Sequence, residues 1–160
     1  MQLTQSQYLL ASDPSTAPVI LRVLSAIDEP IVRARVAENP NCPSELLSVL
    51  LRDHEPSVRL GLIYNPNVSE EILDELASDR SFVVVYALAK NDKMPFALLK
   101  KLAEHPNEFI AARALTTLQD LHRELARAIS SNMRSFEGKF SECAPYGKIF
   151  HIHSSHDDAS

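Results

Sequence analysis

The sequence has no tryptophan, three glycines and two cysteines among its 160 residues. Glycine supplies the positive φ angles of tight β-turns, so its scarcity argues against a sheet-rich fold. Cys42 and Cys143 stand in unlike contexts without metal-ligand spacing, and we expect two reduced thiols. No apolar run approaches the roughly 20 residues of a membrane span. The segment from Met1 to Ser15 lacks the basic and apolar regions of a signal peptide. We therefore expect a cytoplasmic protein without a membrane segment.

Positive charge is also sparse. The chain carries 16 Lys and Arg residues against 21 Asp and Glu residues, a net charge of −5. Proteins that bind nucleic acid draw much of their affinity from dense Lys/Arg surfaces, so this balance argues against a nucleic-acid partner. Neither a Gly-x-Ser-x-Gly nucleophile motif nor a phosphate-binding glycine loop occurs in the sequence. We predict that the protein is not an enzyme and uses no cofactor.

What the sequence does contain is a 26-residue repeat. The pair Asp13-Pro14 is followed at this step by Asn39-Pro40, Asn65-Pro66 and Asn91-Asp92. Rows of apolar residues recur with the same period: Leu21, Leu47, Leu73, Leu99 and Leu125; Leu24, Leu50, Leu76 and Leu102; Val32, Val58, Val84 and Ile110. The register holds from the first of these pairs to the last without an insertion or deletion, so the repeat is structural.

Each unit has the pattern of two helices. Val32 and Val36 are four residues apart, and the leucines of residues 46–51 follow the i, i+1, i+4, i+5 spacing of one buried face. Asn-Pro ends the first helix, because the residue before proline is driven out of the α region. The second helix, which begins near Pro43-Ser44, is expected to be the longer one. Neither helix can bury its apolar side alone, so the hairpins must stack.

These observations predict an all-α fold, a right-handed α-solenoid of about four to five 26-residue hairpins. Nine residues from the periodic rows should form one continuous core: Val36, Leu47, Leu50, Leu62, Leu73, Leu76, Leu88, Leu99 and Leu102. We expect the repeat domain to cover residues 1–134. Its degenerate cap, at about 107–133, would be two closely joined helices or one bent helix. Residues 135–160 form a tail, partly folded back, with a loose end.

The unit Val-Arg-x-x-Val-Ala-x-Asn-Pro-x-x-Pro-x-x-Leu-Leu-x-x-Leu, which spans Val32 to Leu50, resembles the leucine-rich-repeat variant family and the broader HEAT-like class. The resemblance implies an α-solenoid. Some proteins with variant repeats carry an iron–sulfur module held by clustered cysteines, and this chain has no such cluster. In HEAT-like repeats an acidic residue at the end of one second helix meets an arginine six positions later. Asp53 and Arg59 have that spacing, and Asp28 and Arg33 lie five apart.

Two functions are compatible with the residues. The first is an interaction module that binds a protein or peptide through the face lined by the first helices of the hairpins, with these contact residues: Arg35, Arg59, Tyr64, Tyr86 and Lys90. Tyrosine and arginine are favoured at interfaces because they combine large contact area with a polar group. The alternative is an accessory protein that handles a metal or ligand through the histidines of the tail, His151, His153 and His156.

Overall fold

The computed structural model describes residues 2–142, and within them the side chains of residues 4–132. This part of the chain contains nine helices and no strand, which confirms the all-α prediction. The helices are α1 (Gln2–Ser12), α2 (Pro18–Leu24), α3 (Pro30–Glu38), α4 (Ser44–Leu50), α5 (Pro56–Ile63), α6 (Glu70–Leu76), α7 (Phe82–Lys90), α8 (Phe96–Ala103) and α9 (Glu108–Glu142). The chain divides into two compact units, Met1–Leu121 (unit 1) and His122–Ser160 (unit 2).

Helix starts in unit 1 follow the period of the sequence. Helices α2, α4, α6 and α8 begin at residues 18, 44, 70 and 96, and α3, α5, α7 and α9 begin at residues 30, 56, 82 and 108. Proline occupies the first turn of α2, α3 and α5, where its fixed φ suits the helix and its missing N–H costs nothing. The expectation that the second helix is the longer one was wrong. Helices α4 and α6 have seven residues each, whereas α3 has nine and α5 has eight.

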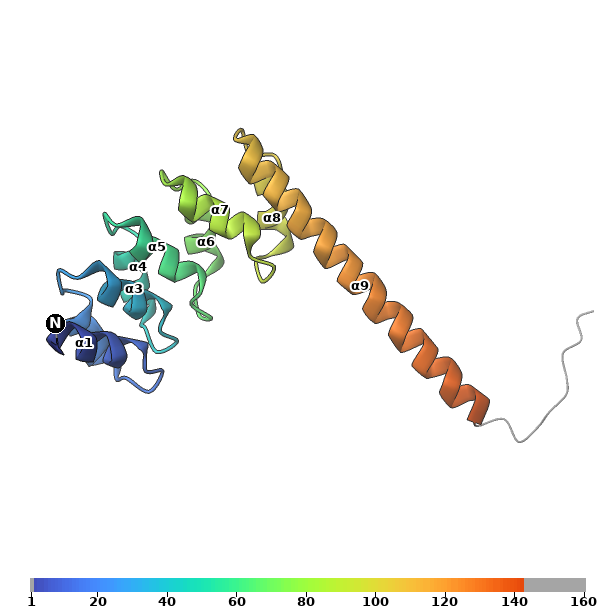
Figure 1. Cartoon of the computed structure of the whole chain (residues 1–160), viewed down its shortest axis with the longest axis horizontal. Coiled ribbons are helices and arrows are strands. Elements are labelled where there is room, and N and C mark those ends of the chain that lie inside the picture. Colours follow the sequence, from blue (N-terminus) through green and yellow to red (C-terminus); the bar gives the residue numbers. More distant parts are fainter. Residues whose placement is uncertain (1, 143–160) are drawn as a thin grey trace, which may run out of the picture. The chain divides into compact units, whose positions relative to one another are not determined.

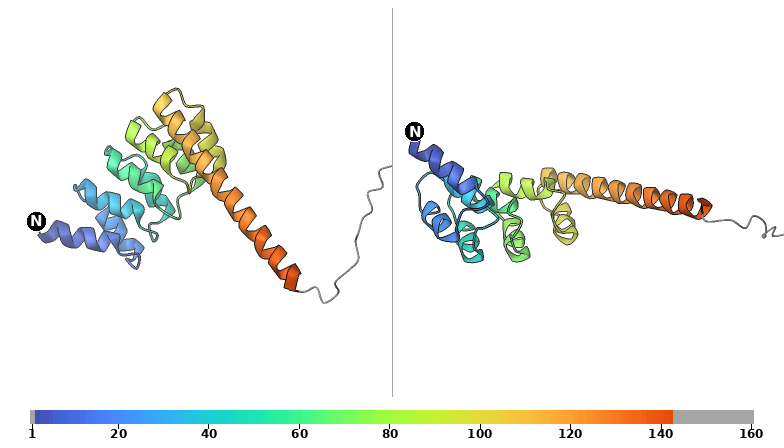
Figure 2. Two further views of the ribbon diagram at one scale, coloured as in Figure 1. Left: turned by 45° about the vertical axis from the view of Figure 1, so that its right-hand side comes forward. Right: turned by 90° about the horizontal axis from the view of Figure 1, so that it is seen from below.

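Unit 1 has two layers. Helices α1, α3, α5 and α7 pack side by side in sequence order, and the first turns of α9 continue that layer. The second layer contains α2, α4, α6 and α8, which are seen below the first layer in the right-hand view of Figure 2. Figure 1 labels all the helices except α2. The buried residues between and within the layers form one core. All nine core residues predicted from the rows lie in it, each at most 5% exposed, so that prediction is confirmed.

In the C-terminal part of the repeat region the predicted alternative of two joined helices is wrong. Helix α9 is a single helix of 35 residues, and the predicted domain boundary after residue 134 falls within it. The physical reason lies at Thr117-Leu118, which replaces the helix-ending Asn-Pro of earlier units. The Thr117 side chain is buried, and its hydroxyl donates a hydrogen bond to the carbonyl of Ala89 (2.7 Å). The end of the predicted tail, from 143 to 160, lies outside the described part of the chain.

Candidate functional site

The face predicted to bind a partner is the outer side of the first layer of unit 1, which we call the A face. Its residues recur at i, i+3, i+4 and i+7 of successive helices, so they share one side of each helix. They are Ile31, Arg35, Glu38, Ser57, Tyr64, Val83, Tyr86, Lys90, Phe109 and Arg113.

Four of the five predicted contact residues lie on the A face with part of their side chains accessible. Tyr64 is 57% exposed, Lys90 is exposed, and Arg35 and Tyr86 are half-buried. Arg35 forms an ion pair with Glu38, and its guanidinium lies over the ring of Tyr8, 5.1 Å from the ring centre. The Arg35 side chain is therefore already held in place by contacts within the protein.

The predicted role of Arg59 at the surface needs correction, because its side chain is only 4% exposed. Its Nε and Nη2 donate to the two carboxylate oxygens of Asp79 at 2.6 and 2.8 Å. Its Nη1 donates to the carbonyls of Asp53 and His54. The arginine therefore connects its own hairpin to the preceding one and offers nothing to a partner. The paired charge also explains why the pKa of Asp79 is lowered: burial acts to raise it, but hydrogen bonds from Arg59 and Ser81 outweigh burial.

The predicted ion pair between Asp53 and Arg59 is also wrong. Asp53 accepts hydrogen bonds from the Nε and Nη2 of Arg33 at 2.7 and 3.0 Å, so the pairing runs 20 residues forward from arginine to aspartate. In a 26-residue repeat, an arginine six residues after one aspartate is also 20 residues before the next. Each arginine could therefore pair with an aspartate six residues before it or 20 residues after it. The first arginine and the last aspartate distinguish the two, because the residue six before Arg33 is Ile27 and the residue six after Asp79 is Val85. Both end members find a partner only at a spacing of 20.

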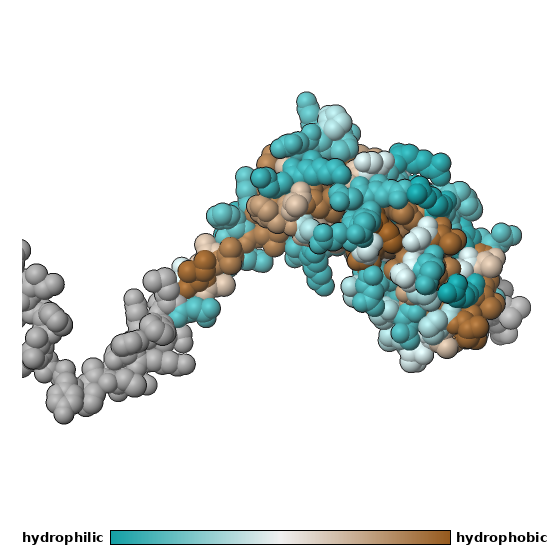
Figure 3. Space-filling view, turned by 180° about the vertical axis from the view of Figure 1, so that it is seen from behind, coloured by the Kyte–Doolittle hydropathy of each residue, from teal (hydrophilic) through white to brown (hydrophobic). Residues whose placement is uncertain are grey.

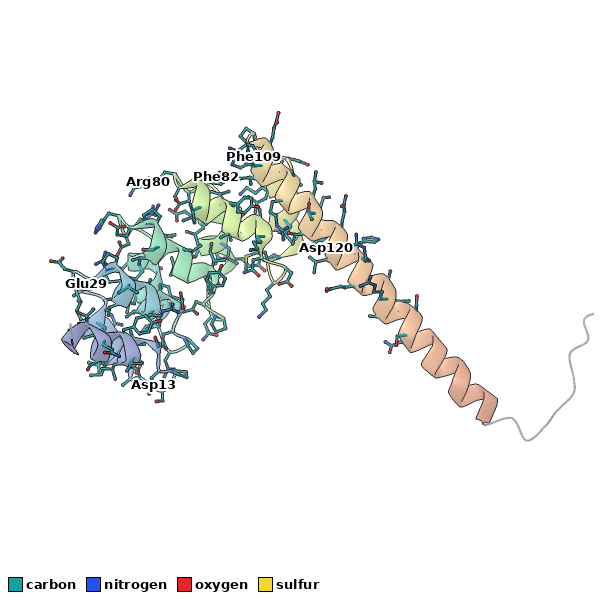
Figure 4. All side chains as sticks on the ribbon, in the orientation of Figure 1. Asp13, Glu29, Arg80, Phe82, Phe109 and Asp120 are labelled. Atoms are coloured by element: carbon teal, nitrogen blue, oxygen red, sulfur yellow. The ribbon has the colours of Figure 1, made fainter. Side chains whose placement is uncertain are left out.

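The A face also carries an apolar row that the sequence analysis missed. Ile31, Val83 and Phe109 occupy the second position of their helices at the 26-residue step, and they are 53%, 59% and 74% exposed. Phe82 lies beside Val83 and stacks on Tyr86, with ring centres 5.4 Å apart. Figure 4 places Phe82 and Phe109 at the same end of α7 and α9. Figure 3, seen from behind, shows further apolar surface of unit 1 interleaved with polar side chains.

The contacts between successive hairpins are of two kinds. We call the contact of α3–α4 with α5–α6 the second joint and that of α5–α6 with α7–α8 the third joint. At the second joint the Nδ2 of Asn65 donates to the carbonyls of Ala37 and Asn39, both at 2.7 Å, and Asn67 Nδ2 donates to the carbonyl of Pro40 at the same distance. Asn65 is 3% exposed. These bonds join the turns of the two hairpins.

Close helix packing is a further feature of the second joint. A Cβ atom placed on Gly61 of α5 would lie 2.6 Å from the carbonyl oxygen of Ala34 and 3.1 Å from the Cβ of Ala37. Since real Cβ atoms do not approach that closely, α3 and α5 pack at a separation that only glycine permits. Together with Arg59 and Asn65, this close approach makes the second joint tight.

The third joint lacks each of these features. The positions of Arg59 and Asp79 are taken by Val85 and His105, so the charged pair is replaced as a unit. The N–H of Lys93 still donates to Asn91 Oδ1 (3.0 Å), but no bond from Asn91 Nδ2 to the preceding turn occurs among the described residues. Lys93 stands in the place of Asn67, and Ala87 in the place of Gly61. The third joint is thus held by apolar contacts of α5 with α7 and by an exposed ion pair of Asp74 with Lys101 at 3.0 Å, and it lacks the asparagine bridges of the second.

A cavity of about 540 Å³ lies at the third joint, between the turn after α5 and the turn after α7. Its apolar walls include Val68, Leu73 and Met94. The carbonyl-bearing residues Ile63 and Asn65 line the same cavity, and so does Asn91. A volume of several hundred cubic ångströms is in the range of pockets that hold small molecules or short peptide segments.

The remaining chemistry of the described residues is limited. Burial raises the pKa of the Cys42 thiol to about 12, although the charge of Arg22 acts in the opposite direction, so the thiol is protonated at neutral pH. No group of three or more His, Cys, Asp or Glu side chains suited to a metal occurs in the described part. The histidines 151, 153 and 156, and Cys143, lie outside it. No helix that the structure describes is both long and apolar enough to cross a bilayer. Comparisons of the chain with family models, curated proteins and solved structures find no match.

Proposed function

We propose that unit 1 is a right-handed α-solenoid of about four to five 26-residue hairpins, similar to leucine-rich-repeat variant and HEAT-like proteins, and that it is a non-enzymatic interaction module. Its A face binds a protein or peptide. Support for the architecture comes from helix starts that recur at the 26-residue step and from the packing of α1, α3, α5 and α7 in sequence order. Stacked repeats of this kind present extended surfaces to partners.

The observation that carries the function is the exposed apolar row of the A face. Single apolar residues on a surface are ordinary. Ile31, Val83 and Phe109 differ because they occupy one helical position in three of four successive units, more than half exposed in each, with Ser57 at that position in the remaining unit. Phe109 adds a large aromatic side chain at the end of the row, and burial of such groups supplies much of the energy of protein association.

Polar groups on the same face fit a partner with hydrogen-bond acceptors. Lys90 is exposed at the end of α7. Arg113 is half-buried on the same face, and its guanidinium carries further hydrogen-bond donors. Because the helices below are already packed, little ordering is needed before a partner binds.

Capture from an extract of native cells tests the proposal, with the full chain as bait. The double substitution Val83→Glu, Phe109→Glu puts charge into the apolar row and should abolish capture of the partner retained by the wild-type chain. The matched control is Val23→Glu, Val49→Glu, which alters two valines of the other layer that are 64% and 65% exposed. Capture that survives the first variant, or that is lost equally with the control, contradicts binding by the A face. Thermal melting of both variants shows whether the fold is intact.

A further inference from the structure

The cavity at the third joint presents the same hydrogen-bond groups that the second joint uses internally. In the second joint, Asn65 donates to the carbonyls of Ala37 and Asn39. One repeat further on, the corresponding groups are Asn91 as donor and the carbonyls of Ile63 and Asn65 as acceptors, and all three residues line the cavity. The first joint, between α1–α2 and α3–α4, repeats the pattern, since Asn39 Nδ2 donates to the carbonyls of Ala11 and Asp13, both at 2.8 Å.

Asn91 is half-buried, whereas Asn39 and Asn65 are 2% and 3% exposed. The Asn91 amide therefore faces space that the equivalent amides fill with a neighbouring turn. Its Oδ1 is occupied by the N–H of Lys93, so the side chain is fixed with its Nδ2 group available as a donor. The joint thus offers a donor and two acceptors at positions where the internal bridge is absent, and the Asn65 carbonyl, which accepts from the N–H of Val68 (3.3 Å), keeps its second lone pair.

We propose that the cavity at the third joint binds an extended peptide segment of a partner through its main chain. An asparagine side chain ends in a carboxamide, which is chemically a peptide group. The N–H groups of a bound segment would donate to the carbonyls of Ile63 and Asn65, and one of its carbonyls would accept from Asn91 Nδ2. One aliphatic side chain of the segment would enter between Val68, Leu73 and Met94.

Charge at the cavity also favours recognition through the main chain. Glu70 and Lys93 both line it, so the two formal charges balance and neither an acidic nor a basic partner is preferred. Tyr64, which the cavity shares with the A face, lines it with an aromatic ring that is mostly exposed. This site does not depend on the A-face proposal, because that proposal rests on Ile31, Val83 and Phe109, which do not line the cavity.

A titration followed by nuclear magnetic resonance tests the proposal. The probe is a capped five-residue peptide with leucine at its centre and alanine elsewhere, added to the isotope-labelled full chain. Saturable shifts are expected in the side-chain amide signal of Asn91, assigned by its loss in Asn91→Asp, and in the backbone signals of residues 63–68. The side-chain amide signal of Asn39, which is bonded internally, should not move.

A second peptide, methylated on the nitrogens of the leucine and of the following alanine, separates main-chain binding from simple apolar contact. Loss of these donors should weaken binding roughly tenfold, the effect of about 1.4 kcal/mol in hydrogen bonding. Equal binding of the two peptides overturns the proposal, as does the absence of any shift at Asn91 up to about 10 mM peptide.

The substitution Lys93→Asn tests the same claim from the side of the protein. It restores the residue that bridges to the preceding turn in the second joint, so the joint should close and binding of the leucine peptide should fall roughly tenfold. Lys100→Asn makes the same chemical change at an exposed position of α8 and should leave binding unchanged. Undiminished binding of the leucine peptide to Lys93→Asn contradicts the site. Neither result bears on capture by the A face.

Discussion

The second and third joints of unit 1 join hairpins of the same length and phase by different chemistry. The second is closed by hydrogen bonds from Arg59 to the carbonyls of Asp53 and His54, by asparagine bridges and by a glycine that lets two helices approach closely. The third keeps the apolar core on both sides, with Leu62, Leu88 and Leu99 fully buried, but replaces the polar and steric devices. The apolar rows therefore determine which helices pack, whereas polar residues at the turns determine how tightly successive hairpins are joined.

The largest difference should follow from Arg59→Ala. The change leaves the Asp79 carboxylate buried without its partner and also removes donors to two carbonyls of the preceding turn. We expect a loss of about 3–5 kcal/mol in the free energy of unfolding, measured by urea titration. The control is Arg52→Ala, whose ion pair with Glu75 is solvent-exposed and should contribute less than about 1 kcal/mol. Similar losses in both variants would show that the buried contacts of Arg59 contribute no more than an exposed ion pair.

The same substitution, asparagine to alanine, can be made at equivalent positions of the two joints, so that its costs in free energy of unfolding are directly comparable. Asn65→Ala removes two hydrogen bonds to buried turns and should cost about 2–4 kcal/mol. Asn91→Ala removes only a local bond to the N–H of Lys93 and should cost less than about 1 kcal/mol. Both are measured by chemical denaturation under the same conditions. Equal costs would mean that Asn91 bridges the third joint in solution, and the contrast between the joints would fail.

Gly61→Ala addresses the steric difference. Alanine normally stabilises a helix relative to glycine, but here its Cβ would press on the Ala34 carbonyl. We expect destabilisation by about 1–3 kcal/mol, detected as a lower melting temperature. At the equivalent position of the third joint, Ala87→Gly should cost about 1 kcal/mol or less, from helix propensity alone. A more stable Gly61→Ala protein would show that α3 and α5 can separate freely.

The smallest expected effect is a pH dependence of the ion pairs. Burial acts to raise the pKa values of Asp53 and Asp79, but hydrogen bonds from arginine and the backbone lower them below the ordinary value. The unfolded chain, with an aspartate pKa near 3.9, therefore takes up protons first as the pH falls. The stabilisation is complete above about pH 4 and is lost as the pH falls through the lowered folded-state values. Urea midpoints between pH 6 and pH 2.5 should fall less steeply in Asp79→Asn than in the wild-type chain.

Much of the fold was predictable because the same pattern of apolar and turn residues recurs in several units. The core rows coincide with the helical period, so residues such as Leu47 and Leu73 can be assigned to the interior from spacing alone. The length of a helix, however, depends on the residues that end it. Thr117 aligns with the asparagine of Asn-Pro and so suggests a turn, but threonine followed by leucine does not stop a helix. The loss of the turn residues is what makes α9 continuous.

The candidate site was harder to predict. The surface role assigned to Arg59 failed because its row, Arg33, Arg59 and Val85, is buried, and the apolar Val85 was the signal that could have shown it. The wrong partner, Asp53 instead of Asp79, followed because a spacing of six along the chain is indistinguishable from a spacing of 20 inside a 26-residue repeat. Arg33 and Asp79, at the two ends of the series, resolve that ambiguity. The cavity at the third joint needed three-dimensional contacts, since Asn91 fits the sequence pattern of Asn39 and Asn65 and differs only in what its Nδ2 meets.

Hydrogen exchange of the native chain tests the contrast between the joints most directly. Helices α3 and α7 are a matched pair, because each lies between two helices of the first layer of unit 1. We expect backbone amides in α7 to exchange through a local opening of lower free energy than those in α3. Their protection factors should be smaller than those of α3 by a factor of roughly ten or more. Equal protection of the two helices, or stronger protection of α7, would contradict the claim that the third joint is the weaker one.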